Sequence, residues 1–121
     1  EQGALILNVK NSIVYSDRDN SVNLEKTMGQ QFNFIFENCL LKYSNESESG
    51  FTFDGNPGII QTIKNQDPLF VNYFAAQMNL RVKQNSPAIG KGSTAVAATV
   101  PTDIANVSRT SNPTLGAYQY F

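Results

Sequence analysis

The chain has 121 residues, of which 40% are hydrophobic and 16% are charged, and its formal net charge is −1 at pH 7. This composition is typical of one folded domain, or part of one, and excludes an intrinsically disordered chain. The near-neutral charge predicts no nucleic-acid partner, and no apolar run approaches the roughly 20 residues of a membrane helix. The first ten residues also lack the pattern of an export signal.

Two residue types limit the chemistry that the chain could perform. The sequence contains no histidine and a single cysteine, Cys39. Without histidine the chain alone cannot build Ser-His-Asp or Cys-His nucleophile systems, or histidine-ligated zinc. The neighbours of Cys39, FENCLLKY, predict a strand in which Cys39 is a small buried apolar residue. An enzyme built from this chain would work with carboxylates, Lys, Arg or Tyr.

Short runs rich in β-branched and aromatic residues alternate with Asn, Ser, Gly and Asp, which predicts an all-β chain. The expected strands are 4–9, 11–16, 31–36, 38–43, 58–63, 68–71, 78–82, 87–90 and 116–121. Residues 71–80 could hold one helical turn. Residues 93–101 are rich in alanine but short and end at Pro101, so we expect no amphipathic helix there.

A repeat is the most informative feature of the first half of the chain. The run VKNSIVYS, from Val9, aligns with FENCLLKY, from Phe36, so that Asn38 follows Asn11 by 27 residues. A period in the twenties is typical of parallel β-solenoids, in which two short strands of a coil meet at a tight corner. Asn tolerates the left-handed backbone of such a corner, and stacked Asn side chains can bond from coil to coil. Coincidence in an Asn-rich chain is the alternative.

A third coil is expected farther along, from PLFVN at residue 68 through SPAI, with Asn85 at its corner. The polar insertion at 44–58 would account for its greater distance from Asn38. Long insertions in solenoids emerge on one face and are often where binding occurs.

An ordered set of motifs covers the second half of the chain. They are Asp67-Pro68-Leu69-Phe70, Leu80, Ser86-Pro87-Ala88-Ile89 with Gly92, Asp103-Ile104 with Arg109, and Gly116-Ala117-Tyr118. Their order and spacing resemble the C-terminal end of secreted bacterial right-handed parallel β-helix proteins of the pectate-lyase-like superfamily. Gln119 departs from the pattern, because an acidic residue commonly follows GAY there.

This resemblance implies a single unit, 1–121, that forms the last few coils and the terminal cap of a right-handed parallel β-helix. Residues 1–92 would be coils, with the insertion at 44–58, and residues 93–121 the cap. The unit would be a fragment of a longer chain whose upstream coils are its partner. A secreted, periplasmic or cell-surface location is implied in the same way.

Members of this superfamily include polysaccharide-degrading enzymes and adhesins, so the resemblance does not fix a reaction. We expect a non-catalytic structural or carbohydrate-binding terminal module, with polysaccharide as its partner and no catalytic residue. The alternative is part of a polysaccharide lyase or glycoside hydrolase whose active site lies mainly on upstream coils. A third interpretation is a small β-sandwich carbohydrate-binding module with antiparallel strands.

The candidate carbohydrate-binding residues are aromatic. Tyr15, Tyr43, Phe51 and Tyr73 lie near expected corners and loops, where a ring could stack on the apolar face of a sugar. The alternative is that these rings cover the ends of the hydrophobic interior.

Asp17, Asp19 and Ser21 occupy alternate positions, as at the start of a calcium loop. Val22 stands where that loop needs Gly and Met28 where it needs Glu, so the match fails halfway. Asp17 and Asp19 remain weak candidates for calcium, and no other cofactor is expected.

The stretch NSPAIGKGST resembles a phosphate-binding loop only superficially. Asn85 stands in place of the first Gly, and Gly92 follows the Lys where Ser or Thr is needed. Pro87 and Pro101 argue against a following helix. We expect a corner instead, with residues 88–89 facing inward and the glycines reversing the chain.

The charged residues suggest little catalysis. Glu46 and Glu48 lie in an expected flexible loop, which is a poor setting for a glycosidase carboxylate pair. Arg81 and Lys83 alternate on an expected strand and are more typical of a solvated face. Asp103 with Arg109 is expected to be a structural pair or to fix a turn in the cap.

Overall fold

The structure is a computed structural model, and it describes residues 5–22, 24, 32–43 and 54–121. Most of its regular elements are strands, accompanied by one short α-helix and one turn of 3-10 helix. The candidate Phe51 and the pair Glu46 and Glu48 lie outside the described residues.

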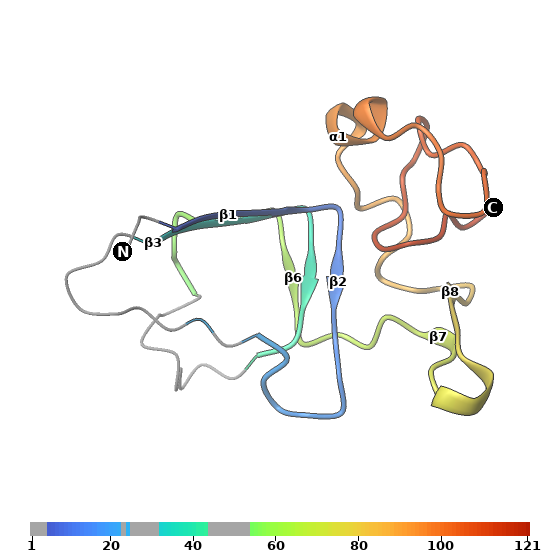
Figure 1. The fold of residues 1–121 in the computed structure, drawn as a ribbon, viewed down its shortest axis with the longest axis horizontal. Helices are drawn as coiled ribbons and strands as arrows, with labels where there is room; N and C mark the ends of the chain where they lie inside the picture. Colours follow the sequence, from blue (N-terminus) through green and yellow to red (C-terminus); the bar gives the residue numbers. More distant parts are fainter. Residues whose placement is uncertain (1–4, 23, 25–31, 44–53) are drawn as a thin grey trace.

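Six strands form two parallel sheets in the first half of the chain (Figure 1). They are β1 (Leu5–Lys10), β2 (Ile13–Val14), β3 (Phe32–Glu37), β4 (Leu40–Leu41), β5 (Ile59–Ile60) and β6 (Ile63–Lys64). One sheet has the order β1-β3-β5 and the other the order β2-β4-β6, so each of three successive strand pairs contributes one strand to each sheet.

The pairing of the first two strand pairs confirms the 27-residue offset. Val9 pairs with Phe36 in the parallel ladder of β1 and β3. Asn11 and Asn38 connect the two strands of their pairs, and both have left-handed backbones, with φ of 50° and 51°. Asn is one of the few residues that adopts this conformation readily.

The third strand pair lies where we did not expect it. Phe36 pairs with Ile59, an offset of 23 residues, and Gln61 occupies the corner with φ of 45°. The expected third coil with Asn85 at its corner is wrong. The repeat shortens rather than lengthens here, and a Gln replaces the Asn that marks the first two corners.

Residues 70–82, which we expected to belong to the third coil, fold as a hairpin. Strands β7 (Phe70–Asn72) and β8 (Asn79–Val82) pair in antiparallel fashion around η1 (Ala75–Gln77), which is the single helical turn expected within 71–80. Asn85 has a left-handed backbone, with φ of 73°, but it lies in the turn after β8.

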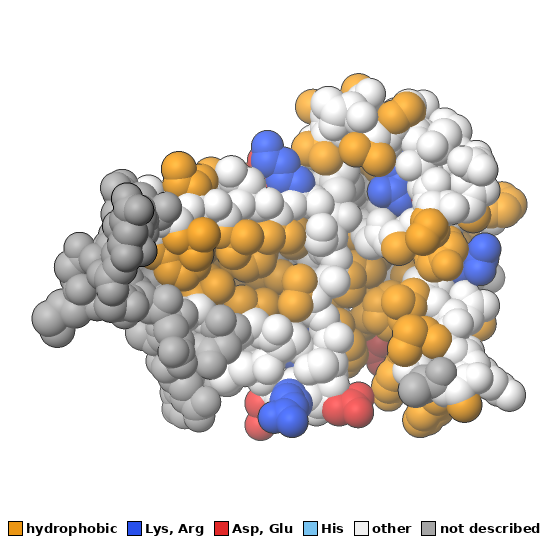
Figure 2. Space-filling view, in the orientation of Figure 1, with side chains coloured by type: hydrophobic (Ala, Val, Ile, Leu, Met, Phe, Trp, Pro, Cys, Tyr) orange, Lys and Arg blue, Asp and Glu red, His pale blue; other side chains and the backbone are white. Residues whose placement is uncertain are grey.

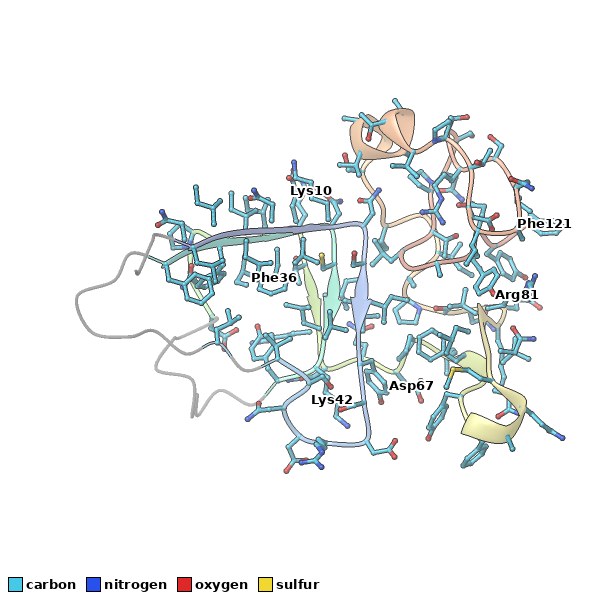
Figure 3. The ribbon with its side chains drawn as sticks, viewed as in Figure 1. Lys10, Phe36, Lys42, Asp67, Arg81 and Phe121 are labelled. Atoms are coloured by element: carbon cyan, nitrogen blue, oxygen red, sulfur yellow. The ribbon has the colours of Figure 1, made fainter. Side chains whose placement is uncertain are left out.

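The sheet β2-β4-β6 is covered on both faces, as is usual for parallel sheets. Leu41 packs in a core with Phe34 and Phe36, whereas its neighbour Leu40 packs on the opposite face against residues of the second half of the chain. Phe36 points toward the space between the two sheets, and Lys10 points away from it (Figure 3). The alternation of side chains along the strands therefore supplies two separate cores.

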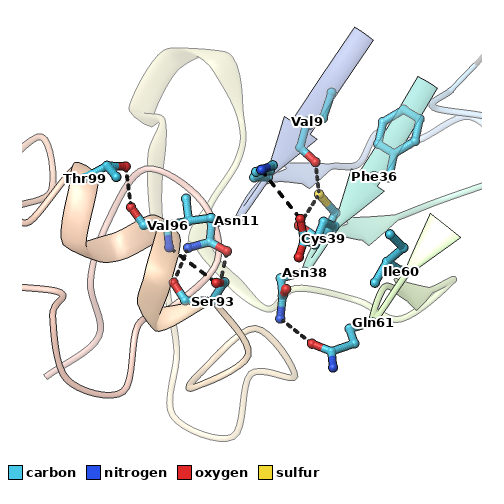
Figure 4. A network of polar contacts seen from close by, with 12 residues as sticks. Val9, Asn11, Phe36, Asn38, Cys39, Ile60, Gln61, Ser93, Val96 and Thr99 are labelled. Carbon is cyan, nitrogen blue, oxygen red and sulfur yellow. Dashed lines mark hydrogen bonds and ion pairs between the residues drawn. The ribbon is translucent and has the colours of Figure 1, made fainter. Parts of the chain in front are cut away.

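Cys39 is fully buried, as expected, but it lies at the corner between β3 and β4 rather than in a strand. Its Sγ lies 3.3 Å from the carbonyl oxygen of Val9 on the neighbouring strand (Figure 4). Burial raises the pKa of this thiol above its ordinary value, which leaves it in the unreactive protonated form.

The second half of the chain contains a helix where we expected none. Helix α1 (Thr94–Thr99) begins after Ser93, whose side chain accepts a hydrogen bond from Val96 N at 3.3 Å. Pro101 lies beyond the end of the helix and does not oppose it. The expectation from Pro87 and Pro101 is therefore wrong, because a Ser cap and a run of alanines suffice for a short helix.

Residues 87–90 and 116–121 form turns and irregular segments rather than the expected strands. The reversal predicted at the SPAIG motif is present, since Ala88 is fully buried and Gly90 has a φ of 69°. Side chains replace the missing backbone ladder. Gln119 is the clearest case: its Oε1 accepts from Thr114 N at 2.9 Å, and its Nε2 donates to Asn112 O at 3.0 Å.

Asp103 fixes a turn in this region, as expected. Its Oδ1 accepts hydrogen bonds from the backbone N–H groups of Ala105 and Val107, and its Oδ2 accepts one from Gln119. Burial by itself raises the pKa of this carboxyl, but the three backbone donors and the charge of Arg109 outweigh it and lower the pKa below its usual value. Asp103 and Arg109 make no ion pair within 4 Å among the described residues.

Candidate functional site

A groove separates the loop after β2 from the β7–β8 hairpin. Its volume is about 290 Å³, and the residues that line it are Ile13, Tyr15, Ser16, Asp17, Phe70, Tyr73, Met78 and Leu80. We call it the aromatic groove. Figure 2 shows hydrophobic side chains gathered where the hairpin faces the strand pairs.

The wall on the strand-pair side is held by short-range polar contacts. Tyr15 follows β2, and Lys42 Nζ lies 5.0 Å from the centre of its ring. The same ammonium donates a hydrogen bond to the carbonyl of Ser16 at 3.0 Å. Ser16 Oγ lies 2.8 Å from Ser21 Oγ, which closes the loop. The Tyr15 ring is therefore oriented by a cation–π contact and by a closed loop.

The hairpin supplies the opposite wall. Asn72 Oδ1 accepts a hydrogen bond from Phe74 N at 3.0 Å, which turns the chain at the end of β7. The ring of Tyr73 then stacks on that of Phe74, with centroids 5.3 Å apart and an angle of 16° between the planes. Tyr73 remains 51% exposed, so a bound molecule could reach its ring.

The chemistry of the groove suits binding of an uncharged, hydroxyl-bearing molecule. Aromatic rings on both walls can contact apolar ring faces, while Ser16 and Asp17 can accept or exchange hydrogen bonds with hydroxyl groups. Among the described lining residues, Asp17 is the one carboxylate. Glycosidases of the two-carboxylate type need a second one across the sugar.

Two of the four aromatic candidates therefore come together. Tyr15 and Tyr73 face the same groove although they are far apart in the sequence. Tyr43 is 3% exposed and packs in the core with Phe34 and Phe36, so its ring fills the interior. Burial, followed by the nearby carboxylate of Asp54, raises the pKa of its hydroxyl.

The two calcium candidates line different cavities. Asp17 lines the aromatic groove, whereas Asp19 lines a neighbouring pocket beside Tyr15 and Lys42. Within the part of the chain that the structure describes, no three His, Cys, Asp or Glu residues cluster closely enough to hold a metal ion.

Sequence reasoning missed Phe70, Met78 and Leu80 as groove residues. Met78 directly precedes β8 and Leu80 lies in it two positions later, a spacing that places side chains of extended backbone on one face. This spacing is the signal that the sequence offers. That their face meets Tyr15 depends on tertiary packing.

Comparison of the chain with protein family models, with curated proteins and with solved structures gives no match. In the described ranges, no helix combines the length and the apolar character needed to cross a bilayer. The functional proposal therefore rests on the geometry of the aromatic groove and on the sequence motifs.

Proposed function

We propose that the chain is a non-catalytic, carbohydrate-binding terminal module of an exported bacterial parallel β-helix protein. The observation that carries this proposal is the meeting of Tyr15 and Tyr73 in one groove beside Asp17. Rings that present an apolar face and a polar tip are suited to sugars, whose own faces are apolar and whose edges carry hydroxyl groups. Polysaccharide is therefore the proposed partner.

The parallel strand pairs support the β-helix part of the proposal. Each pair adds one strand to each of two parallel sheets, and a left-handed Asn or Gln stands at each corner. Stacked repeats of this kind build solenoids, and parallel connections are right-handed in nearly all proteins. The ordered DPLF, SPAI and GAY motifs favour the pectate-lyase-like superfamily, and a secreted or cell-surface location follows from that assignment.

The exposed side of β1 supports a further coil. Leu5 and Ile6 are 55% and 68% exposed, and among the described strands β1 pairs with β3 alone. An unpaired strand edge with apolar neighbours is a template for another strand. We propose that an upstream coil of the parent protein pairs with β1 and covers these side chains.

Electrophoresis in polysaccharide-containing gels tests the binding proposal. We expect the protein to migrate more slowly in a gel that contains a polysaccharide to which it binds than in a gel without polysaccharide. We expect Tyr73→Ala to remove most of this retardation. Phe121→Ala is the matched control, because Phe121 is highly exposed and lies outside the groove. Equal mobility of the protein in all polysaccharide gels, or equal retardation of Tyr73→Ala, would refute the proposal.

The same incubation distinguishes binding from catalysis. A binding module leaves the polymer intact, whereas a lyase creates unsaturated ends that absorb ultraviolet light. A steady rise in absorbance with uronate polymers would replace the binding proposal with an enzymatic one.

A further inference from the structure

A second cavity, of about 390 Å³, lies between the corner after β1, helix α1 and the C-terminal loop. We call it the seam pocket, because it separates the strand pairs from the second half of the chain. It shares Ile13 with the aromatic groove, and their other described lining residues differ. Its volume is within the range of small-molecule sites.

Arg109, which lines this pocket, is 8% exposed and incompletely bonded. Among the described residues its guanidinium makes one hydrogen bond, from Nη2 to the carbonyl of Gly116 at 3.2 Å, and its buried Nε has no partner. A guanidinium has five N–H donors, and buried polar groups are nearly always hydrogen-bonded. Arg109 therefore brings to the pocket lining N–H donors that the described residues leave unused.

The carboxylate of Asp103 does not fill the role of an acceptor for these N–H donors. The charge of Arg109 helps to lower the pKa of Asp103, but both oxygens of Asp103 accept hydrogen bonds from backbone N–H groups. The positive charge of Arg109 is therefore buried without a hydrogen-bonded counter-ion among the described residues. A buried charge is costly unless it is paired.

A second cation borders the same pocket. Lys10 lies at the end of β1, and its Nζ is 3.7 Å from a carboxylate oxygen of Glu37, which is a loose and partly exposed pair. Figure 2 shows basic side chains on both sides of the notch between the strand pairs and the part that carries α1. No carboxylate is among the described lining residues, so the pocket favours an anion.

The position of α1 against the corner is fixed by reciprocal hydrogen bonds (Figure 4). Asn11 Nδ2 donates to the carbonyl of Ser93 at 3.0 Å, and Ser93 N donates to Asn11 Oδ1 at 2.7 Å. These contacts hold the N-cap of the helix beside the corner after β1, and Val96, Val100 and Ile13 all line the pocket. One wall of the pocket is therefore apolar.

We propose that the seam pocket binds a small organic carboxylate with an aliphatic portion. The carboxylate would accept hydrogen bonds from Arg109, whose fork matches its two oxygens, and would be attracted by Lys10. The aliphatic portion would lie against Val96 and Val100. A bare inorganic anion would leave this apolar wall in contact with water, so it binds less well.

Titration of the 121-residue chain with hexanoate, followed through its amide resonances, tests this proposal. We expect saturable shifts at the amides of α1 and Gly116. Hexanol lacks the carboxylate and inorganic phosphate lacks the aliphatic portion, so each should bind at least about tenfold more weakly than hexanoate. Absence of saturation with hexanoate, or equal binding of hexanol or of phosphate, would overturn it.

Two sets of variants keep the test independent of folding. Lys10→Gln changes a partly exposed side chain and should lower the affinity for hexanoate about threefold. Val100→Glu and Val100→Gln both remove apolar contact from an exposed position, but the former also introduces a competing carboxylate. We expect Val100→Glu to bind hexanoate with an affinity about tenfold lower than that of Val100→Gln. Equal affinities in this pair would contradict the carboxylate site, and Tyr73→Ala, a groove variant, should bind hexanoate normally.

Discussion

In the described residues between 5 and 64, backbone hydrogen bonds between parallel strands join each strand pair to the next. In residues 65–121, side chains hold the backbone at many of its turns. Leu40 N donates to Ser12 O, and Ile63 N donates to Cys39 O, so the first region repeats one backbone pattern. In the second region Asp103 and Gln119 bind several backbone groups each. A repeated ladder tolerates a shorter repeat and a Gln at the corner, whereas a side-chain framework depends on particular residues.

The two regions meet at Leu40, so its truncation should have the largest effect. Leu40 is fully buried and packs with Ala88 and Leu115 of the second region. We expect Leu40→Ala to lower the free energy of unfolding by about 2–5 kcal/mol, through lost burial and a cavity. Urea denaturation followed by circular dichroism measures this loss. Ile35→Ala, on an exposed outer position of β3, is the control and should cost far less.

This variant also tests whether the regions unfold together. A single transition that moves as a whole supports one cooperative unit. Two transitions, of which Leu40→Ala shifts one, would show that the comparison is between two independently folded parts.

Asp103→Asn should have the next largest effect on stability, because it removes one of the side-chain hydrogen bonds that hold the backbone of the second region. An Asn oxygen can still accept from Ala105 and Val107, but its amide nitrogen cannot accept from Gln119 N. A buried donor without a partner costs about 1–3 kcal/mol, and urea denaturation at neutral pH measures that cost.

The pH dependence of the same pair isolates the charge of Asp103. Its pKa is lower in the folded protein than the ordinary value, so its contribution to stability is complete above about pH 4 and is lost as the pH falls toward the folded pKa. The difference in free energy of unfolding between the wild-type protein and Asp103→Asn should therefore become smaller below about pH 4. A difference that stays constant down to pH 2 would contradict this role of the carboxylate.

Asn38 tests the corner of the repeated region. Its side chain donates to Gln61 Oε1 and to Lys91 O, and its backbone is left-handed. Asn38→Ala loses the hydrogen bonds and strains the backbone, whereas Asn38→Gly loses the hydrogen bonds alone. We expect Ala to be less stable than Gly by about 1 kcal/mol in thermal or urea unfolding. The reverse order would show that the left-handed corner is not formed.

Lys10→Gln should have the smallest effect on stability. The Lys10–Glu37 pair is partly exposed and loose, so its loss should cost less than about 1 kcal/mol. A larger loss in urea denaturation would mean that charge pairs, rather than the backbone ladder, hold the strand pairs together.

Much of the repeated region could be predicted from the sequence, because Asn11 and Asn38 mark its corners at a fixed offset. The third pair could not, since Gln61 carries no comparable signal and the spacing shortens to 23 residues. In the second region, the reversal at Gly90 and the turn at Asp103 were predictable from residue type. The helix after Ser93 is hard to predict because Pro101 lies close to it and usually opposes helices, but Pro101 stands after the helix has ended.

The aromatic groove was predictable only in part. The residue types of Tyr15 and Tyr73 favour stacking, but the packing of the hairpin against the loop after β2 decides that they share a groove and that Tyr43 does not. No local pattern encodes such a contact. The seam pocket likewise depends on residues that only the tertiary structure places together, Lys10 and Arg109.

Nuclear Overhauser contacts between backbone protons give the most direct test of the stacked strand pairs. The parallel register predicts contacts of Leu40 with Ser12 and Ile13, and of Ile63 with Cys39 and Leu40, in increasing order along both strands. Contacts that run in opposite order along residues 11–16 and 38–43 would show an antiparallel hairpin and would contradict the account.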